Sequence, residues 1–265
     1  MQDRYAVIGN PIEHSKSPLI HTAFARSTGE KLTYDRMLGD LQHFEQDVAD
    51  FFRQGGRGLN VTAPFKERAW HLADSRGSEA EGARAVNTLL QMPDGSLRGE
   101  NTDGTGLVRD LTLNHDYLLS GSRILLLGAG GAAKGVAGPL LKQGPEQLLI
   151  ANRTAAKAYS LARQLEDAGK VDWCGLEDLE GRQFDLIING TAAGLNAEIP
   201  HIPDEILASG GWVYDLMYAS EPTAFVRWGR AHSAAKSLDG LGMLVEQAAE
   251  SFFLWRGLRP ETSSV

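Results

Sequence analysis

The sequence predicts an α/β protein built from two domains. Short apolar runs of strand length alternate with helical patterns from residue 5 onward. A chain of 265 residues is long enough for two domains of modest size. Near its middle, residues 123–135 form an apolar run, a glycine-rich turn and a helical run of small residues, in that order. This order indicates that a distinct structural unit begins there.

The glycine-rich turn fits the pattern G-x-G-x-x-G/A, with Gly128, Gly130 and Ala133 at the three small positions. The first small residue allows a tight turn, the second lets the backbone approach a pyrophosphate, and the third lets the helix pack on the strand. Free N–H groups at the start of the helix then face the phosphates. An ordinary strand-to-helix turn is the alternative, but the flanking strand and helix favour a Rossmann dinucleotide-binding domain.

Composition limits the classes of partner. The net charge is −8 and the sequence has no block of Lys or Arg, so nucleic acids and anionic membranes are poor partners. No apolar run approaches the ~20 residues that span a bilayer, and the first residues lack a secretory signal. Cys174 is the only cysteine and the histidines lack ligand spacing. We therefore expect no disulfide, no metal site and a cytoplasmic location.

At the start of the chain, a buried strand over residues 5–9 precedes a helix that begins near Pro18 and ends at Gly29. Ser17 directly precedes the proline and suits the N-cap, so capping alone could explain it. Ser15 has no such structural role. Two interpretations stay open for Ser17: a helix cap, or one of two hydroxyls that hold a carboxylate.

Polar side chains gather where the next predicted strands end. Residues 32–38 and 58–62 read as strands on either side of a helical stretch at 41–52. Pro64 then stops strand pairing, and Lys66 follows it. Strand ends that face a cleft are where open α/β sheets carry out chemistry, although most lysines are simply solvated surface residues.

A hairpin follows, with strands expected over 85–90 and 97–101 around a short turn. Asn87 lies in the first strand, and Asp103 follows the second, where it could instead cap the next helix. Because the segments around Lys66, Asn87 and Asp103 all emerge from predicted strand ends, we expect them to contribute to one site.

The strand expected over 148–151 ends at Asn152, Arg153 and Thr154. An acidic residue there would accept from the ribose 2′-OH of NAD and repel a 2′-phosphate, whereas a guanidinium forks onto that phosphate. The sequence therefore favours NADP over NAD. The alternative is that Thr154 caps the next helix and Arg153 faces solvent.

Further strands are expected over 184–189, 212–215 and 236–238, and the polar stretch 114–121 suggests a boundary before the glycine-rich unit. The closing helix carries an apolar stripe of Leu241, Leu244, Val245, Ala248, Ala249, Phe252 and Phe253. This stripe is too aromatic to stay in water, so we expect it to pack on another element. Gln247 flanks the stripe and is either exposed or reaches a cleft.

Motifs along nearly the whole chain resemble the shikimate dehydrogenase family, in the family's order. They are Gly9-Asn10-Pro11, Ser15-Lys16-Ser17-Pro18, Asn60-Val61-Thr62-Ala63-Pro64-Phe65-Lys66, Ala85-Val86-Asn87-Thr88, Asn101-Thr102-Asp103-Gly104, Gly128-Ala129-Gly130-Gly131-Ala132, Asn152-Arg153-Thr154 and Asp239-Gly240-Leu241-Gly242-Met243-Leu244 through Gln247. The segment into Lys66 and the one around Asp103 are specific for the family, whereas the glycine-rich turn alone is not.

The resemblance implies an NADP-dependent oxidoreductase that interconverts shikimate and 3-dehydroshikimate, on the route to aromatic amino acids. It also implies two domains: a substrate domain of residues 1–104 completed by the C-terminal helix in 241–265, and a Rossmann NADP-binding domain over 105–240. The partner is then a small-molecule substrate, and the chain is a monomer or a homodimer.

The resemblance assigns Lys66 and Asp103 as the catalytic pair. The substrate-binding residues it implies are Ser15 and Ser17 for the carboxylate, Asn60, Thr62, Asn87, Asp103 and Gln247 for the ring hydroxyls, and Lys66 and Tyr218 on the substrate side. The cofactor-binding residues it implies are Gly128, Ala129, Gly130, Gly131, Ala132, Asn152, Arg153, Thr154, Lys157, Leu216, Gly240 and Met243.

Two segments depart from the family pattern. Lys157 stands where the family often has arginine, so a point charge replaces a fork on the 2′-phosphate and we expect a weaker preference for NADP. After Asn189, Gly190 stands where alanine is expected, and Ala192 and Ala193 stand where a more polar pair is expected, which leaves cofactor contacts there unassigned.

Three alternatives remain for the function. An NAD-using quinate/shikimate dehydrogenase is disfavoured by Arg153. A nucleotide-sensing binding module that lost the reaction could dispense with Lys66 or Asp103, and both are present. A folate-linked dehydrogenase shares the Rossmann part but lacks the serine pair combined with Asn87.

Overall fold

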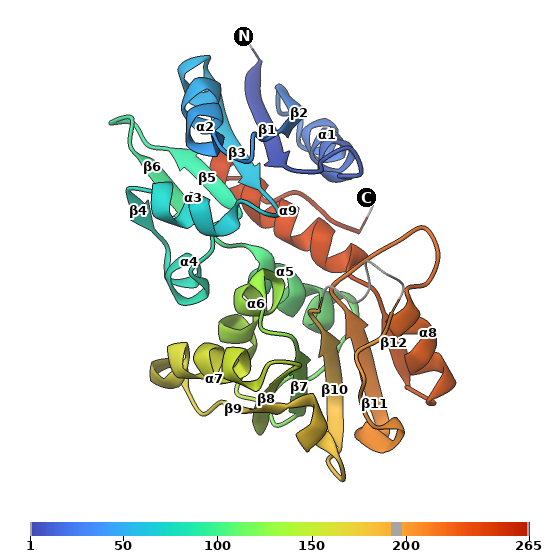
Figure 1. Ribbon diagram of the computed structural model, residues 1–265. Helices are drawn as coiled ribbons and strands as arrows, with labels where there is room; N and C mark the ends of the chain where they lie inside the picture. Colours follow the sequence, from blue (N-terminus) through green and yellow to red (C-terminus); the bar gives the residue numbers. More distant parts are fainter. Residues whose placement is uncertain (1, 192–197, 264) are drawn as a thin grey trace. The chain divides into compact units, whose positions relative to one another are not determined.

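The computed structural model describes residues 2–191, 198–263 and 265. The chain forms two compact units, Met1–Gly106 with Leu244–Val265 as the first and Leu107–Met243 as the second. The chain passes between them within two helices, α5 (Asp103–Arg109) and α9 (Leu241–Arg256), and not within the polar stretch 114–121 (Figure 1).

The first unit contains a six-stranded mixed sheet in the order β2-β1-β3-β5-β6-β4. Its strands are β1 (Asp3–Gly9), β2 (Leu32–Leu38), β3 (Gly56–Val61), β4 (Ser75–Arg76), β5 (Thr88–Gln91) and β6 (Leu97–Glu100). Its helices are α1 (Ser17–Thr28), α2 (Phe44–Arg53), α3 (Lys66–Leu72) and α4 (Ser78–Ala83), together with the start of α5 and most of α9. β1 runs parallel to β2 and β3, whereas β5 is antiparallel to β3 and β6.

The C-terminal helix α9 completes the core of the first unit by packing on α1. The buried residues of this contact are Ile20, Phe24, Val245, Ala248, Ala249 and Phe252. The predicted stripe was too wide, because Leu241 and Phe253 at its edges are exposed. The expectation that this helix packs on another element is confirmed.

The second unit contains a six-stranded parallel sheet in the order β12-β11-β10-β7-β8-β9. Its strands are β7 (Arg123–Leu127), β8 (Gln147–Asn152), β9 (Asp172–Gly175), β10 (Phe184–Asn189), β11 (Leu207–Asp215) and β12 (Lys236–Leu238), and its helices include α6 (Gly131–Leu141), α7 (Ala155–Gln164) and α8 (Ala224–Ala231). Read from β7, this is the 3-2-1-4-5-6 order of a Rossmann fold.

Both faces of the second sheet are buried, which explains why its central strands read as continuous apolar runs. Ile124 and Leu126 belong to one core cluster and Leu125 and Leu127 to another, so the side chains of β7 alternate between two layers. The carboxyl end of β7 is thereby fixed rigidly, and the glycine-rich turn follows directly.

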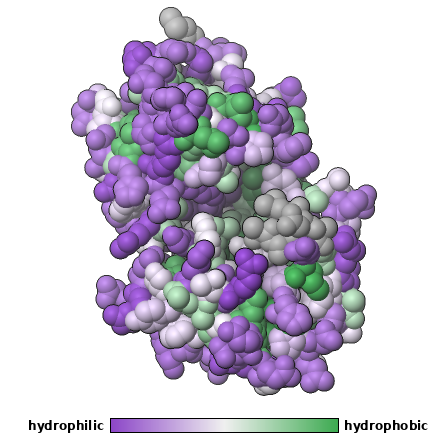
Figure 2. Space-filling view, viewed as in Figure 1, coloured by the Kyte–Doolittle hydropathy of each residue, from purple (hydrophilic) through white to green (hydrophobic). Residues whose placement is uncertain are grey.

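Two strands begin three or more residues away from the expected positions. β5 begins at Thr88 and not at residue 85, although the Asn87 main-chain oxygen still accepts the Val61 N–H at 2.8 Å. β11 begins at Leu207 and not at residue 212. Two glycines inside the strand interrupt the apolar pattern, so only residues 212–215 read as a strand in the sequence. Within the described residues, the model has no helix long and apolar enough to cross a membrane. Hydrophilic residues predominate on the face shown in Figure 2.

Candidate active site

Lys66 and Asp103 meet in the first unit. Lys66 Nζ lies 2.6 Å from Asp103 Oδ2, and the two side chains are 23% and 9% exposed. Lys66 is the first residue of α3, which starts after Pro64 leaves β3, and Asp103 is the first residue of α5, which follows β6. The two residues are close because β3 and β6 both pair with β5.

Asn87 holds the second oxygen of the same carboxylate. Its Nδ2 donates to Asp103 Oδ1 at 2.8 Å and lies 3.4 Å from Gln247 Oε1. Asn87 directly precedes β5 and was wrongly predicted to lie within a strand. Since β5 is antiparallel to its neighbours, its start lies beside the ends of β3 and β6.

The alternative that Asp103 serves as a helix cap is not supported by its contacts. Its carboxylate bonds Lys66 and Asn87, and its own N–H donates to Asn101 Oδ1 at 3.1 Å. Asn101, two residues earlier, therefore supplies a side-chain acceptor for the first N–H of α5.

Asn60 and Gln247 lie in the same polar cluster. Asn60, on β3, is nearly fully buried and accepts from the Tyr34 hydroxyl at 2.7 Å. Gln247, on α9, is partly buried, and its Nε2 donates to the Leu244 carbonyl at 2.8 Å. The interpretation of Gln247 as an exposed residue is therefore wrong. Thr62 follows β3 and is also partly buried.

The two serines take different roles from those expected. α1 begins at Ser17 itself, with Lys16 in the N-cap position, so the prediction of Ser17 as N-cap is wrong. Ser15 Oγ instead accepts the Ser17 N–H at 3.3 Å. Ser17 is buried and Ser15 is partly exposed. A proline after Ser17 misled the interpretation, because proline is tolerated throughout the first helical turn.

Four further residues of this cluster, all buried, were not predicted from the sequence: Tyr34, Thr88, Thr102 and Ser251. Thr88 and Thr102 lie within the motifs quoted above, beside Asn87 and Asp103. Ser251 follows Gln247 by four residues, so both lie on one face of α9. A polar residue at this spacing beside an apolar stripe was a signal that could have identified it.

In the second unit, the turn after β7 has the backbone that the glycine pattern requires. Gly128 has φ +105°, and an added Cβ would lie 2.9 Å from the Gly190 carbonyl oxygen. α6 begins at Gly131 after Gly130, and Ala133 is fully buried against the sheet. Ala129 is buried and Ala132 exposed. Among the described residues, no heavy atom lies within 4 Å of an added Cβ at Gly130 or Gly131.

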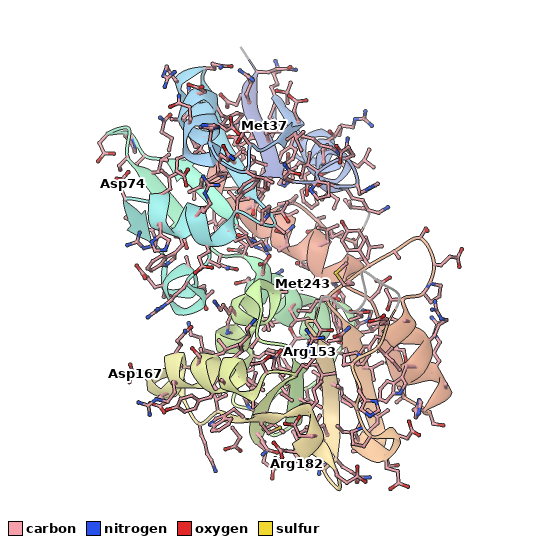
Figure 3. All side chains as sticks on the ribbon, viewed as in Figure 1. Met37, Asp74, Arg153, Asp167, Arg182 and Met243 are labelled. Atoms are coloured by element: carbon pink, nitrogen blue, oxygen red, sulfur yellow. The ribbon has the colours of Figure 1, made fainter. Side chains whose placement is uncertain are left out.

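The end of β8 presents the predicted basic residue to solvent. Arg153, Thr154 and Lys157 are exposed, and Thr154 is the N-cap residue of α7 (Figure 3). Asn152 Nδ2 donates to the Thr154 carbonyl at 3.0 Å, which fixes the turn. Of the alternative, the solvent-facing arginine agrees with this geometry, whereas Thr154 occupies the N-cap position of α7 without a side-chain capping hydrogen bond. The exposed arginine is compatible with a phosphate contact.

The remaining predicted residues lie on segments that follow β11 and β12 in the second unit. The Leu216 N–H donates to the Asn189 carbonyl at 2.9 Å, and the Gly240 N–H donates to the Met217 carbonyl at 3.0 Å. Met243 is buried, and its N–H donates to the Tyr214 hydroxyl at 3.2 Å. Burial raises the pKa of Tyr218. The departure at Ala192 and Ala193 lies outside the described residues.

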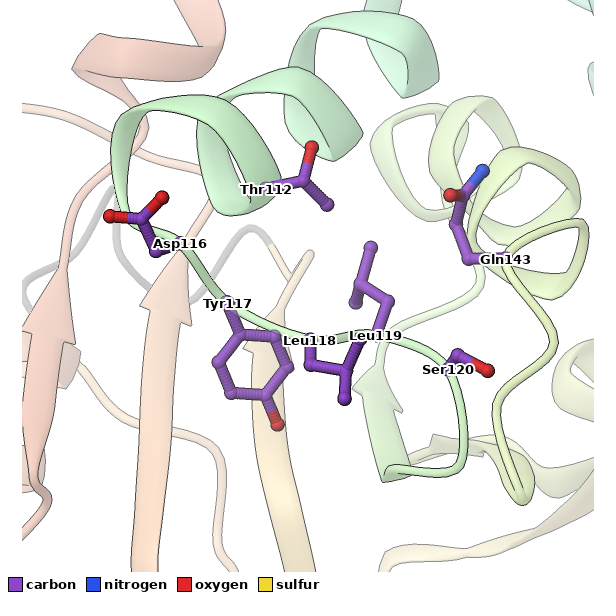
Figure 4. A pocket seen from close by; sticks show the side chains of 7 residues that line it. All are labelled: Thr112, Asp116, Tyr117, Leu118, Leu119, Ser120 and Gln143. Atoms are coloured by element: carbon purple, nitrogen blue, oxygen red, sulfur yellow. The ribbon is translucent and has the colours of Figure 1, made fainter.

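A cavity of about 340 Å³ lies elsewhere in the second unit, beside the loop before β7 (Figure 4). It is lined by Thr112, Asp116, Tyr117, Leu118, Leu119, Ser120 and Gln143. These lining residues include none of the predicted site residues. In the part of the chain that the model describes, no group of three or more His, Cys, Asp or Glu side chains could hold a metal ion.

A parallel sheet in Rossmann order with a glycine-rich first turn defines a dinucleotide-binding α/β protein, and the lysine–aspartate pair adds a group able to transfer a proton. Three family models match the chain in order: "Shikimate dehydrogenase substrate binding domain" at residues 7–89, "Shikimate / quinate 5-dehydrogenase" at 112–197 and "Shikimate 5'-dehydrogenase C-terminal domain" at 240–265.

Individual relatives cover the whole chain. A protein from Alkalilimnicola ehrlichii named shikimate dehydrogenase (NADP(+)) is 57% identical over 100% of this chain and 97% of its own. The solved structure of an enzyme from Pseudomonas putida named Ael1 is 46% identical, with a TM-score of 0.93 over 99% of this chain and 96% of that one. Shikimate 5-dehydrogenase from Thermus thermophilus, in complex with NADP(H) and shikimate, is 32% identical with a TM-score of 0.88 over 99% and 96%. The chain belongs to the shikimate dehydrogenase family.

Proposed function

We propose that the protein catalyses the reversible, NADP-dependent reduction of 3-dehydroshikimate to shikimate. The observation that carries the proposal is the pairing of Lys66 with Asp103 at 2.6 Å, with Asn87 on the other carboxylate oxygen. This arrangement lies in the unit that contains the match to a substrate-binding domain, while the other unit carries the dinucleotide-binding turn.

The second unit fits NADP. The open space at Gly130 and Gly131 lets a pyrophosphate approach the backbone, and the N–H groups at the start of α6 favour its charge. Arg153, Thr154 and Lys157 are solvent-facing at the end of β8, where a 2′-phosphate lies in a Rossmann fold. When bound, NADPH supplies the hydride for the ketone carbon.

Lys66 supplies the proton. Its ammonium donates to the carbonyl oxygen of the substrate, where negative charge develops during reduction, and the amine accepts the proton in the reverse direction. Asp103 accepts a hydrogen bond from Lys66 Nζ and thereby orients the ammonium. Asn87 donates to the other oxygen of the same carboxylate and thereby fixes the orientation of Asp103.

The other predicted residues position the substrate. Ser15 and Ser17 bind the carboxylate with neutral donors, which avoids a second cation near Lys66. Asn60, Thr62 and Gln247 bind ring hydroxyls, together with Asn87 and Asp103. Tyr218 binds on the substrate side, and Leu216, Gly240 and Met243 line the nicotinamide pocket. The cytoplasmic location and the monomeric or homodimeric state stay predictions.

The test is an assay with purified protein and three mixtures: shikimate with NADP⁺, shikimate with NAD⁺, and quinate with NADP⁺. Nicotinamide absorbance reports the reaction. We expect turnover in the first mixture and much slower turnover in the second. Equal rates with both nucleotides would favour the NAD-using alternative, and tight NADP⁺ binding without turnover of any hydroxy acid would favour the binding module.

A further inference from the structure

A run of buried polar side chains leads away from the catalytic pair through the first unit. It consists of Asn87, Thr88, Asn60 and Tyr34, whose exposed fractions are 3%, 0%, 6% and 6%. Buried polar groups are costly unless they are hydrogen-bonded, so each proton in this run has to be matched to an acceptor. The hydrogen bonds of the Asn87 side chain fix the first donor and acceptor in this run.

The orientation of the Asn87 amide is fixed from two sides. Its Oδ1 lies 2.9 Å from the Thr102 main-chain nitrogen, which can only donate. Its Nδ2 lies 2.8 Å from Asp103 Oδ1, which accepts when the carboxylate is ionised. A flipped amide would place its oxygen against the carboxylate and its NH₂ group against an N–H.

This orientation determines the direction of the next bonds. Thr88 Oγ1 lies 2.9 Å from Asn87 Oδ1, so the Thr88 hydroxyl has to donate there. The same hydroxyl oxygen can then only accept from its other neighbours, and Asn60 Nδ2 donates to it at 3.1 Å. Asn60 Nδ2 also donates to the Asn87 main-chain oxygen at 3.1 Å, which confirms the Asn60 orientation independently.

The remaining steps follow from the same logic. Asn60 Oδ1 can only accept, so the Tyr34 hydroxyl donates to it at 2.7 Å. Burial raises the pKa of Tyr34 well above its ordinary value, with a hydrogen bond from Ser17 acting in the opposite direction, so the phenol keeps its proton. The bonds thus run in one direction: Tyr34 to Asn60, Asn60 to Thr88, Thr88 to Asn87, and Asn87 to Asp103.

We propose that Thr88 is a positioning residue for the reaction: its hydroxyl joins Asn60 to Asn87 and holds the Asn87 amide with its N–H side toward the Asp103 carboxylate. The proposal rests on the proposed function of Lys66 and Asp103. Hydrogen bonds that run in one direction polarise one another, which strengthens the bond at the carboxylate.

Ser251 on α9 supports the same step. Its Oγ lies 2.8 Å from Thr88 Oγ1 and 3.1 Å from the Gln247 main-chain oxygen, so the single Ser251 proton serves one of these two contacts at a time. Asn60 Nδ2 also lies 3.0 Å from Ser251 Oγ, but its two protons are already directed at Thr88 Oγ1 and the Asn87 main-chain oxygen. Ser251, from the C-terminal helix, therefore contacts both Thr88 and Asn60.

A purely structural role for Thr88 predicts different kinetics. In that case the hydroxyl only satisfies neighbouring polar groups, and its loss lowers stability without a selective effect on the shikimate reaction. Valine has nearly the shape of threonine but no hydroxyl, and serine keeps the hydroxyl but lacks the methyl group. These two replacements separate the hydrogen bond from the packing of the methyl group.

The experiment compares Thr88→Val, Thr88→Ser and wild type in shikimate oxidation, with Thr28→Val as the matched control. The Thr28 hydroxyl donates to the Phe24 carbonyl within α1, so its loss removes a hydroxyl from the same unit outside the chain of bonds. For Thr88→Val we expect kcat/KM for shikimate to fall about tenfold, the size of one buried hydrogen bond. Thr88→Ser should retain most of it, and KM for NADP⁺ should not change in any variant.

Three kinetic results overturn the proposal. One is a Thr88→Val enzyme with wild-type kcat/KM for shikimate. Another is a Thr88→Ser enzyme that is impaired as much as Thr88→Val, because the methyl group and not the hydroxyl would then matter. A rise in KM for NADP⁺ equal to the loss in kcat/KM would also overturn it, since the effect would not be selective for the Asn87–Asp103 contact.

A second readout does not depend on activity. In ¹⁵N-labelled protein, the side-chain amide signal of Asn87 is identified by its loss in Asn87→Asp, and its hydrogen exchange with water is measured. We expect slow exchange in wild type and Thr88→Ser and faster exchange in Thr88→Val; equal exchange in all three overturns the proposal. If wild type does not oxidise shikimate with NADP⁺, the proposed function fails, while the exchange rates still decide whether Thr88 holds the amide.

Discussion

At the scale of single residues, Lys66 carries the proposed proton transfer most directly. Replacing it with alanine removes the only cation that hydrogen-bonds the Asp103 carboxylate in the described structure. We expect kcat of Lys66→Ala to fall by roughly 10² to 10⁴, the usual contribution of a positioned acid or base. Steady-state kinetics with shikimate and NADP⁺ measure this. Lys31→Ala, at an exposed position of the same unit, should keep wild-type turnover; near-normal turnover of Lys66→Ala would contradict the assignment.

Arg153 is the residue to which we assign the preference for NADP. Its guanidinium is exposed at the end of β8 and is free to fork onto a 2′-phosphate. For Arg153→Ser we expect KM for NADP⁺ to rise roughly tenfold to a hundredfold, as expected for the loss of a charge-assisted hydrogen bond, with KM for NAD⁺ unchanged. Arg182→Ser removes an exposed arginine from a different turn of the same unit and serves as the control. Parallel increases in both Michaelis constants would indicate a general loss of binding.

Residue types and motifs were sufficient to predict that Lys66 and Asp103 lie together, because each follows a strand and the motif around it is specific. They were not sufficient for Tyr34, Thr88 and Ser251. Whether a threonine hydroxyl in a strand is buried beside an asparagine depends on strand register, and Asn60 faces Thr88 across a pair of strands 28 residues apart in the chain. A single sequence does not fix that register.

At the scale of elements, the start of α9 depends on a contact that no local pattern predicts. The Tyr214 hydroxyl, at the end of β11, accepts the Met243 N–H at 3.2 Å and donates to Asp110 Oδ2 at 2.7 Å. Asp110 opens a single π-helical turn, η1 (Asp110–Asn114), which follows α5. Such turns rarely occur without a local function, and here the turn places a carboxylate against Tyr214.

This contact gives a prediction for Tyr214→Phe. The variant leaves the Met243 N–H and one oxygen of a buried carboxylate without the hydroxyl, so the free energy of unfolding should fall by about 1 to 3 kcal/mol. Urea unfolding monitored by circular dichroism measures the change. Tyr159→Phe, which removes a hydroxyl from a half-exposed ring, is the control. A Tyr214→Phe protein as stable as wild type would show that the hydroxyl does not hold the start of the helix.

The elements themselves were largely predictable, since β7 and the turn after it form a local pattern of strand, glycines and helix. The errors fall where a distant contact overrides local preference. β5 starts at Thr88 because the Asn87 side chain bonds Thr102 and Asp103. Ser17 lies inside α1, and the Ser15 hydroxyl accepts the N–H of Ser17. Both errors occur at residues of the proposed active site, where polar contacts compete with regular structure.

At the scale of the whole molecule, hydrogen bonds join the first strand of the chain to its last helix within the first unit. Arg256, at the end of α9, donates to Asp3 Oδ2 at 2.5 Å and to Glu30, and also to the Tyr5 hydroxyl at 3.2 Å. β1 and the last helix are thereby joined across 253 positions of sequence. Since α9 also carries Gln247 and Ser251, this ion pair supports the helix that contributes to the polar cluster around Asn87.

The same ion pair makes part of the stability depend on pH. The hydrogen bond from Arg256 lowers the pKa of Asp3 below its ordinary value of 3.8. A depressed carboxyl pKa contributes stability that is fully present above the unfolded value and is lost as the pH falls through the folded value. Because Asp3 is about one-third exposed, solvent screens the pair, and we expect Arg256→Gln to cost only about 1 kcal/mol near neutral pH.

The difference in unfolding free energy between Arg256→Gln and wild type should be constant above about pH 5 and should shrink below about pH 4. Urea titrations across this range measure it, with Arg26→Gln, an exposed arginine on α1, as the control. A difference that stays the same at every pH would show that Arg256 acts through packing and not through its charge on Asp3.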